Sequence, residues 1–463
     1  MMDRSKSRID LKPRVIATVL FVGSILLTAC QTRTETGAMG PSVDTSAASI
    51  VAVEATPALE EAAAYTAEEA YGFRNAMTID NWDEGGPLMR YVFLNMGEFF
   101  NESSIHRTGP IAPLDYELGD EIGELETSSR LGEMSLDDYI HKAAVDGIVI
   151  LHKGKIVYES YPKMRAQDKH LLMSVSKGYT STLVAILEDR GLVDQNAPIE
   201  IYLPELAGSG WEGVSVLDIL DMASGIDCHE SNKGAYSDPA ECYYQYEASL
   251  GWLGATEATF DSPYEHLATL QRHRPAGEAF EYTSPNTFIL SWLIERVTGK
   301  TYVAVLSEEI WQKIGSESDG LLSSPRRGIP IAHGGISATL RDVARFGLLF
   351  TPSWKVVATG PVISPAYAEK IRSGGRPEIY DKGINANPGG LPVDGEMPRH
   401  NTYQWDFVME DGDFFKGGYG GQGLYISPDR DIVVTYFGTF DVGGRTNQLD
   451  DVSRQISKSD LFD

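Results

Sequence analysis

The sequence has little of several features, and each scarcity argues against one class of protein. It has only three cysteines in 463 residues, which excludes a small scaffold held together by many disulfides. It has 39 basic against 66 acidic residues, and the resulting formal net charge of −27 disfavours nucleic acid as a partner. Hydrophobic residues make up 42% of the chain, close to the globular average, which disfavours wholesale disorder. The length then fits one large domain of mixed structure or two of ordinary size.

Several familiar motifs are also missing. There is no G-x-S-x-G nucleophile elbow, no H-E-x-x-H zinc motif and no P-loop. The one G-x-G-x-x-G, at 418–423, leads into a predicted strand, whereas a dinucleotide site needs it to open a helix. The nine histidines are scattered, and each is interpreted as a surface or hydrogen-bonded residue. No metal and no organic cofactor are therefore implied.

The N-terminus has the layout of an export signal. Five basic residues precede an apolar run at 15–27 that is too short to span a bilayer comfortably. The run ends in Leu27-Thr28-Ala29-Cys30, which resembles the lipobox of bacterial lipoproteins. This resemblance implies removal of residues 1–29 and lipidation of Cys30, and Gln31 favours the outer membrane. We therefore expect a lipoprotein of the bacterial cell envelope, on the periplasmic face of the outer membrane and attached through its lipid alone.

The rest of the chain divides into four parts by composition. Residues 30–70 are mostly small and polar and predict a flexible tether, and residues 71–135 predict an extension packed on the following domain. Strand pairs are predicted at 147–161 and at 423–437, with helical patterns between them, so we expect a catalytic domain over 136–445 in which early and late strands share one antiparallel sheet. Residues 446–463 are left as a C-terminal tail.

Two cysteines remain after Cys30. Cys228 and Cys242 are close in sequence, and an exported protein meets oxidising conditions, so we predict a disulfide between them. The alternative is a metal site made of both cysteines and His229, but tandem ligand spacing is absent.

The sequence S-x-x-K occurs twice, and the two copies differ in their fitness for catalysis. A serine and a lysine three residues apart lie on one face of a helix, where the amine can take the hydroxyl proton if burial depresses its pKa. Pro162 breaks this geometry between Ser160 and Lys163. The copy from Ser174 to Lys177 opens a predicted amphipathic helix that runs to about residue 190. Alone it could also be a helix cap followed by a surface lysine.

Several other segments, together with this second copy, resemble the motifs of one known family. They are His170-Leu171-Leu172-Met173-Ser174-Val175-Ser176-Lys177-Gly178, Leu220-Asp221-Met222-Ala223-Ser224-Gly225, Pro275-x-Gly277-x-x-Phe280-x-Tyr282, Gly334-Gly335-Ile336-Ser337-Ala338-Thr339 and Gly418-Tyr419-Gly420-Gly421-Gln422. On these motifs, from about residue 75 to 440, the chain resembles the serine β-lactamase-related hydrolases of the class C and penicillin-binding type. Within them it most resembles the branch of 6-aminohexanoate-dimer hydrolase and related esterases. The resemblance implies an α+β fold of the β-lactamase/transpeptidase type, an antiparallel sheet flanked by helices with a helical subdomain.

The resemblance also implies roles for residues. Ser174 would be the acylated nucleophile, Lys177 its partner and Tyr282 a second proton-transfer group, whose phenol pKa we expect a nearby lysine to lower. The backbone N–H groups of Ser174 and Gly418 are candidates for the oxyanion hole, although glycines there could instead mark a bulge. Candidates for substrate binding are Ser284, Tyr419 and Tyr236. For the tyrosines near the cysteines, a packed aromatic loop is the alternative.

Two positions depart from the family pattern. Class C enzymes have Tyr-x-Asn where this chain has Tyr282-Thr283-Ser284, and serine is too short to reach a substrate amide as asparagine does. The Lys-Thr-Gly of the last catalytic strand appears as Lys416-Gly417-Gly418, with either Phe415 or Lys416 in its first position. The first departure favours esters and linear amides over β-lactams.

Three functions therefore stand as hypotheses. The first is hydrolysis of a small-molecule carboxylic ester or linear amide through an acyl-enzyme on Ser174. The second is a β-lactamase or D,D-peptidase, and the third is an inactive envelope-binding lipoprotein with the same fold.

Overall fold

The computed structural model describes residue 59 and residues 61–382, 392–441 and 449–462. The predicted signal peptide and Cys30 lie outside these residues. Within the described part of the chain, no helix combines the length and the apolar character needed to cross a membrane.

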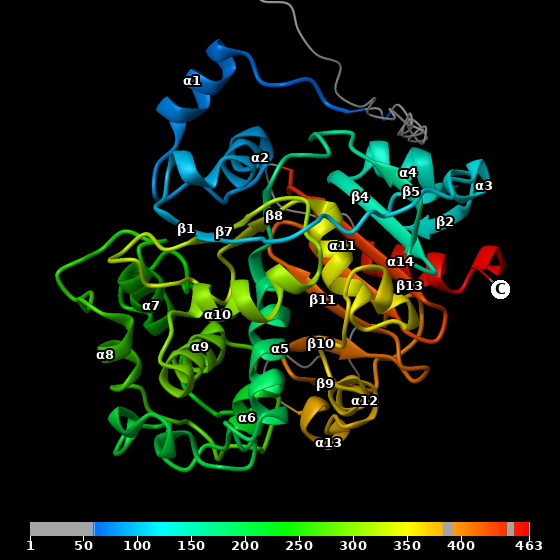
Figure 1. Cartoon of the computed structure of the whole chain (residues 1–463). Helices are drawn as coiled ribbons and strands as arrows, with labels where there is room; N and C mark the ends of the chain where they lie inside the picture. Colours follow the sequence, from blue (N-terminus) through cyan, green and yellow to red (C-terminus); the bar gives the residue numbers. More distant parts are fainter. Residues whose placement is uncertain (1–58, 60, 383–391, 442–448, 463) are drawn as a thin grey trace, which may run out of the picture. The chain divides into compact units, whose positions relative to one another are not determined.

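The largest sheet has seven antiparallel strands in the order β5-β4-β13-β12-β11-β10-β9. Their bounds are β4 Val145–His152, β5 Lys155–Ser160, β9 His400–Thr402, β10 Trp405–Val408, β11 Phe414–Gly418, β12 Gln422–Ser427 and β13 Ile432–Gly438. The early strand β4 pairs with the late strand β13, with Ile150 opposite Val434 (Figure 1). The prediction that both ends of the domain share one sheet is confirmed.

Side chains alternate between the two faces of this sheet and separate two apolar cores. Val149 and Val433 belong to the core shared with α5 (Ser176–Asp189) and α11 (Leu340–Leu348). Their neighbours Ile150 and Val434 belong to the core on the opposite face, shared with α4 (Leu136–Lys142) and α14 (Leu449–Ser457). Helices therefore cover both faces, as the predicted fold class requires.

The helical region lies beside this sheet, on the chain between β6 (His170–Leu171) and β9 (Figure 1). Its helices are α6 Val216–Leu220, α7 Cys242–Leu250, α8 Pro263–Leu267, α9 Ser284–Thr298 and α10 Tyr302–Glu309. The chain also forms the helices α3 Asp120–Gly123, α12 Pro365–Ser373 and α13 Pro377–Tyr380 and a small sheet of β2 Glu126–Ser129 and β3 Gly132–Ser135. The α+β class with a helical subdomain is confirmed.

The N-terminal segment is built into the domain. Helix α1 spans Ala67–Ala76, and so begins inside the residues predicted as a tether, and α2 spans Gly86–Leu94. Strand β1 (Glu102–Ile105) pairs with β7 (Gly320–Ser323) in a second sheet, whose order is β1-β7-β8-β6, with β8 at Ile336–Ala338. Trp82, Met89 and Phe93 are buried in the main core. The N-terminal segment is thus stabilised by joining the larger core.

The C-terminus differs from the predicted tail. Leu449, Val452 and Ile456 follow a helical spacing and are fully buried against the sheet in α14. The apolar pattern consists of only three residues, so the sequence alone does not distinguish this helix from an exposed polar segment. These residues complete one face of the sheet.

A buried carboxylate joins the N-terminal segment to both sheets. Asp146 on β4 accepts a hydrogen bond from Arg90 Nε on α2 at 2.6 Å, lies 3.3 Å from His170 Nε2 on β6 and also binds the Thr439 hydroxyl. Burial alone would raise the pKa of Asp146, but the hydrogen bond with His170 and the charge of Arg90 outweigh it and hold the pKa below its ordinary value.

Replacing this carboxylate should therefore destabilise the fold. We expect Asp146→Asn to lower the free energy of unfolding in urea by about 3–5 kcal/mol, because Arg90 is left without its partner. The contribution is present above pH about 4 and is lost as the pH falls through the lowered folded-state pKa. Glu117→Gln breaks the exposed pair with Lys155 and should change stability far less than Asp146→Asn does, because solvent screens exposed charges. Equal effects of the two substitutions would contradict the role of Asp146.

Candidate active site

Ser174 lies in a single 3₁₀ turn, Met173–Val175, that leads directly into α5. The predicted helix thus begins at Ser176, two residues later than expected. Met173 has a positive φ of 47°, a conformation that costs roughly 1–3 kcal/mol for a residue with a side chain. The surrounding structure holds it, since Leu172 N–H donates to Ile336 O at 2.8 Å and the Ile336 N–H donates to Ser176 Oγ at 3.2 Å. The serine is therefore fixed between β8 and the start of a helix.

Lys177 is completely buried one turn further along, and its ammonium group faces the serine. Its Nζ donates to Ser174 Oγ at 2.8 Å, to Ser284 Oγ at 2.9 Å and to the carbonyl oxygen of His333 at 3.1 Å. Burial lowers the pKa of Lys177 to about 8, against the opposing charge of Glu230. The predicted pairing of Ser174 with a lysine of depressed pKa is thus present in the structure.

The other S-x-x-K copy has no such geometry. Ser160 is the last residue of β5, and Lys163 Nζ turns away to the carbonyl oxygen of Ala143 at 2.9 Å. Ser160 and Lys163 therefore do not lie on one face of a helix, as expected from the proline between them.

Tyr282 lies between two lysines. Lys177 Nζ and Lys416 Nζ are each 5.0 Å from the centre of its ring, and Lys416 Nζ donates to the phenol oxygen at 3.1 Å. The expected lowering of the phenol pKa is wrong. Burial raises the pKa of Tyr282 well above 10, the negative charges of Asp406 and Glu230 add to this, and a hydrogen bond with Ser174 only partly offsets it. The phenol is therefore a neutral hydroxyl at physiological pH.

Lys416 occupies the first position of the Lys-Gly-Gly segment. Its buried Nζ pairs with Asp406 Oδ1 at 2.6 Å and reaches Tyr282, whereas Phe415 points to the other face of the sheet and stacks on Phe407. Sequence reasoning left this register open and missed Asp406. The reason is that the ion pair joins neighbouring strands, β10 and β11, and has no local signature.

Gly418 ends β11 against the serine turn. A Cβ at this position would lie 2.5 Å from the carbonyl oxygen of Leu172 and 3.2 Å from Met173 Cβ, so only glycine allows this approach. Pairing with β12 is regular up to Gly418 opposite Gln422, so the alternative of a bulge is wrong. The end of the strand therefore lies beside the residues that precede Ser174.

A cavity opens above Ser174. All three predicted substrate-binding residues line it: Ser284 is buried beside Lys177, while Tyr236 and Tyr419 are about half exposed at its mouth. Its other lining residues are Trp82, Asp83, Met173, Glu230, Tyr243, Glu247, Trp252, Leu253, His333 and Gly334. The site is thus an apolar and aromatic pocket with three carboxylates in its wall.

These carboxylates were not predicted from the sequence. Glu247 Oε1 accepts from Tyr243 at 2.8 Å and lies 3.0 Å from His333 Nε2, and Glu230 accepts the Ser284 N–H at 2.5 Å. Burial raises the pKa of Asp83 to about 6, with a smaller contribution from Glu247. They come from segments far apart in the chain, and no motif groups them.

The predicted disulfide between Cys228 and Cys242 is present, with a Cα–Cα distance of 5.3 Å. It joins the segment that carries Glu230 to α7, which carries Tyr243 and Glu247. Because both sulfurs are bonded to each other, the alternative of a metal site built on the two thiolates is wrong.

Comparison with known proteins agrees with this geometry. The Beta-lactamase family model matches residues 137–456. The chain is 34% identical over 361 residues to the 6-aminohexanoate-dimer hydrolase of Paenarthrobacter ureafaciens, covering 77% of this chain and 86% of that protein. It is 24% identical over 262 residues to the esterase/beta-lactamase LipL of Mycobacterium tuberculosis, covering 55% of this chain and 52% of that protein.

Among solved structures, one from Bacillus anthracis, proposed to be a 6-aminohexanoate-dimer hydrolase, superposes with a TM-score of 0.68. It has 24% sequence identity, and the match covers 83% of this chain and 96% of that one. At this identity the likeness shows the fold. The family model, by contrast, covers well over half of the chain and includes Ser174, Lys177 and Tyr282. The chain therefore belongs to the beta-lactamase family and is a serine hydrolase with the β-lactamase/transpeptidase-like fold.

Proposed function

We propose that Ser174 forms the acyl-enzyme during hydrolysis of a linear amide or carboxylic ester, with Lys177 and Tyr282 moving the protons. The observation that carries this proposal is the 2.8 Å contact of Ser174 Oγ with a buried amine whose pKa is about 8. A serine hydroxyl becomes an effective nucleophile when such a base takes its proton. A lysine whose pKa lies near the working pH provides the base in an appreciable fraction of molecules.

The first half of the reaction uses these groups in sequence. Lys177 in its neutral form accepts the Ser174 proton while the serine oxygen attacks the substrate carbonyl. The negative charge that develops on the carbonyl oxygen is stabilised by the backbone N–H groups of Ser174 and Gly418. The neutral Tyr282 hydroxyl then protonates the leaving amine or alcohol, and the Lys177 ammonium, which holds the proton taken from Ser174, returns a proton to the phenolate. Water attacks the ester in the second half, and the same groups work in reverse.

The raised pKa of Tyr282 supports this division of roles. A phenol whose pKa lies well above 10 carries a proton at neutral pH and can give it away, whereas a phenolate could not. The Lys416 ammonium donates to the same oxygen at 3.1 Å and stabilises the negative charge that appears there during transfer.

The acidic wall of the pocket favours a substrate that carries an amine. Asp83, Glu230 and Glu247 line the cavity with Ser174, and a protonated amine would be attracted to them. The relative from Paenarthrobacter ureafaciens hydrolyses the 6-aminohexanoate dimer, as its name states. We propose amino-acid-derived linear amides, or the corresponding esters, as the substrate class.

We further propose that the protein is exported and anchored through a lipid on Cys30. The basic flank, the apolar run and the Leu27-Thr28-Ala29-Cys30 segment support this. The disulfide between Cys228 and Cys242 fits the same location, since such bonds persist in the bacterial periplasm.

Ser174→Ala should abolish hydrolysis. We expect the native protein to turn over short p-nitrophenyl esters or 6-aminohexanoate dimer in preference to nitrocefin, and the variant to show no burst of acyl-enzyme. Ser160→Ala, in the other S-x-x-K copy, should keep native activity. Equal turnover by native protein and Ser174→Ala would refute the nucleophile, and preferential hydrolysis of nitrocefin would favour the β-lactamase alternative.

The rate should follow the protonation of Lys177. Because the neutral amine is the active form, kcat/KM should rise with pH through about 8 and level off above it. Lys177→Ala should lose roughly 100-fold or more in kcat and the pH step with it. Lys163→Ala, its counterpart in the other copy, should retain both. A native profile that is flat from pH 6 to 10 would remove Lys177 as the base.

Cys30→Ser should block lipidation. The full-length variant should move from the membrane to the soluble fraction of the cell envelope and should no longer incorporate labelled palmitate. Cys228→Ser, which removes a disulfide cysteine outside the lipobox, should stay with the membrane. Unchanged fractionation of Cys30→Ser would contradict the anchor.

A further inference from the structure

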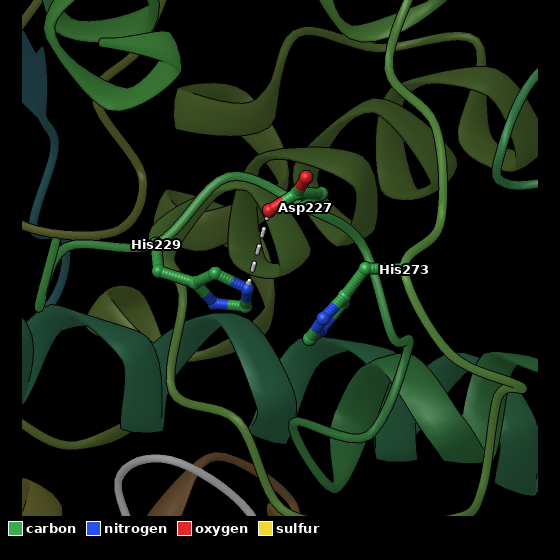
Figure 2. A group of neighbouring side chains, drawn as sticks. All are labelled: Asp227, His229 and His273. Atoms are coloured by element: carbon green, nitrogen blue, oxygen red, sulfur yellow. Dashed lines mark ion pairs between the residues drawn. The ribbon is translucent and has the colours of Figure 1, made fainter.

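Three side chains that the reaction does not use lie close together in the helical region. Figure 2 shows Asp227, His229 and His273, which offer one carboxylate oxygen and two ring nitrogens within 4.8 Å of one another. None of them lines the cavity above Ser174. They form a group of possible metal ligands that is separate from the catalytic site.

Backbone pairing brings the three together. The Asp227 N–H donates to Gln271 O at 2.9 Å, the His273 N–H donates to Gly225 O at 3.0 Å, and Ile226 and Arg272 form an antiparallel bridge. Asp227 and His273 are therefore diagonal neighbours on one face of a short two-stranded pairing. Two residues beyond Asp227, His229 turns towards the same face (Figure 2).

His229 has the character of a ligand rather than of a core residue. Its side chain is only 3% exposed, and neither ring nitrogen has a hydrogen-bond partner among the residues that the structure describes. Its Nε2 lies 3.9 Å from Asp227 Oδ1, too far for a hydrogen bond. Buried polar groups are nearly always paired, so an imidazole in this state indicates a partner that is not part of the chain.

His273 is oriented by a second carboxylate. Its Nε2 lies 2.8 Å from Glu281 Oε2, and Glu281 is itself buried and held by Arg274 Nη2 at 3.0 Å. When Nε2–H donates to Glu281, Nδ1 keeps its lone pair available for a cation. A carboxylate behind a histidine in this way is the usual support of a metal-binding imidazole.

We propose that Asp227, His229 and His273 bind one divalent transition-metal ion of the zinc type. Two imidazoles and one carboxylate favour such an ion over calcium or magnesium, which prefer oxygen ligands. Bonds of about 2.0–2.1 Å to a tetrahedral ion place ligand atoms roughly 3.4 Å apart. The ligands therefore need to close by less than about 1.5 Å, and Asp227, with 63% of its side chain exposed, is free to rotate. The ion would enter from solvent on the side where Asp227 is exposed.

The ion would act as a clamp on the active-site wall. His229 is followed by Glu230, which accepts the Ser284 N–H, and Glu281 is followed by Tyr282. A metal joining residues 227–229 to His273, which contacts Glu281, would hold the segment of Glu230 and the segment of Tyr282 at a fixed separation. The metal would thus support the pocket wall and would have no part in the attack on substrate.

Calorimetric titration of the metal-stripped full-length protein, without a histidine tag, tests this site. We expect one equivalent of Zn²⁺ to bind and to raise the melting temperature, and one equivalent of Co²⁺ to give visible d–d absorption. Asp227→Asn and His273→Ala should each weaken Zn²⁺ binding roughly 10-fold or more and abolish the Co²⁺ spectrum. Circular dichroism checks that both variants remain folded.

His106→Ala is the matched control, because His106 also lies beside a carboxylate, Asp319, at 3.6 Å but on the exposed surface. It should bind both ions as the native protein does. Absence of Zn²⁺ binding by the native protein would overturn the proposal. So would binding that survives in both Asp227→Asn and His273→Ala, or that is lost in His106→Ala.

Discussion

The active site depends on a buried amine whose hydrogen-bond partners carry no charge. Lys177 Nζ binds two hydroxyls and one carbonyl oxygen, so nothing in direct contact compensates its desolvation as a cation. Lys416 is just as buried but pairs with Asp406 at 2.6 Å. The two lysines beside Tyr282 thus differ in their surroundings, because Lys416 has a carboxylate neighbour and Lys177 does not. Tyr282 lies between them, with each Nζ 5.0 Å from the centre of its ring.

This arrangement needs both halves of the fold, the helical region and the part built on the large sheet. Ser174 and Lys177 begin α5, Tyr282 and Ser284 come from the start of α9 in the helical region, and Lys416 and Gly418 end a strand of the large sheet. The absence of a side chain at Gly418 lets the strand meet the serine turn. The disulfide and the contact of Glu230 with the Ser284 N–H hold the helical side in place. Changes in the separation of the two halves would therefore act on all of the catalytic groups at once.

The sequence predicted features that depend on local geometry. The two strand pairs were found from their turns. Helical spacing and the lack of proline favoured the Ser174–Lys177 copy over the copy at Ser160, and the family resemblance supplied its expected role. Features that depend on chain segments brought together by folding were missed: the pair of Lys416 with Asp406, the acidic pocket wall and the cluster around His229. The direction of the Tyr282 pKa shift was wrong because a neighbouring cation was weighed without the burial that outweighs it. The C-terminal helix was missed because its apolar pattern is too short.

The family model begins at residue 137, yet the pocket wall includes Trp82 and Asp83 from the N-terminal segment. Ser174 and part of the wall of the cavity above it thus belong to different stretches of the gene. Selection can alter or exchange the early stretch and change which molecules enter, while the proton-transfer machinery stays intact. A family with one reaction can in this way acquire new substrates from outside its shared domain.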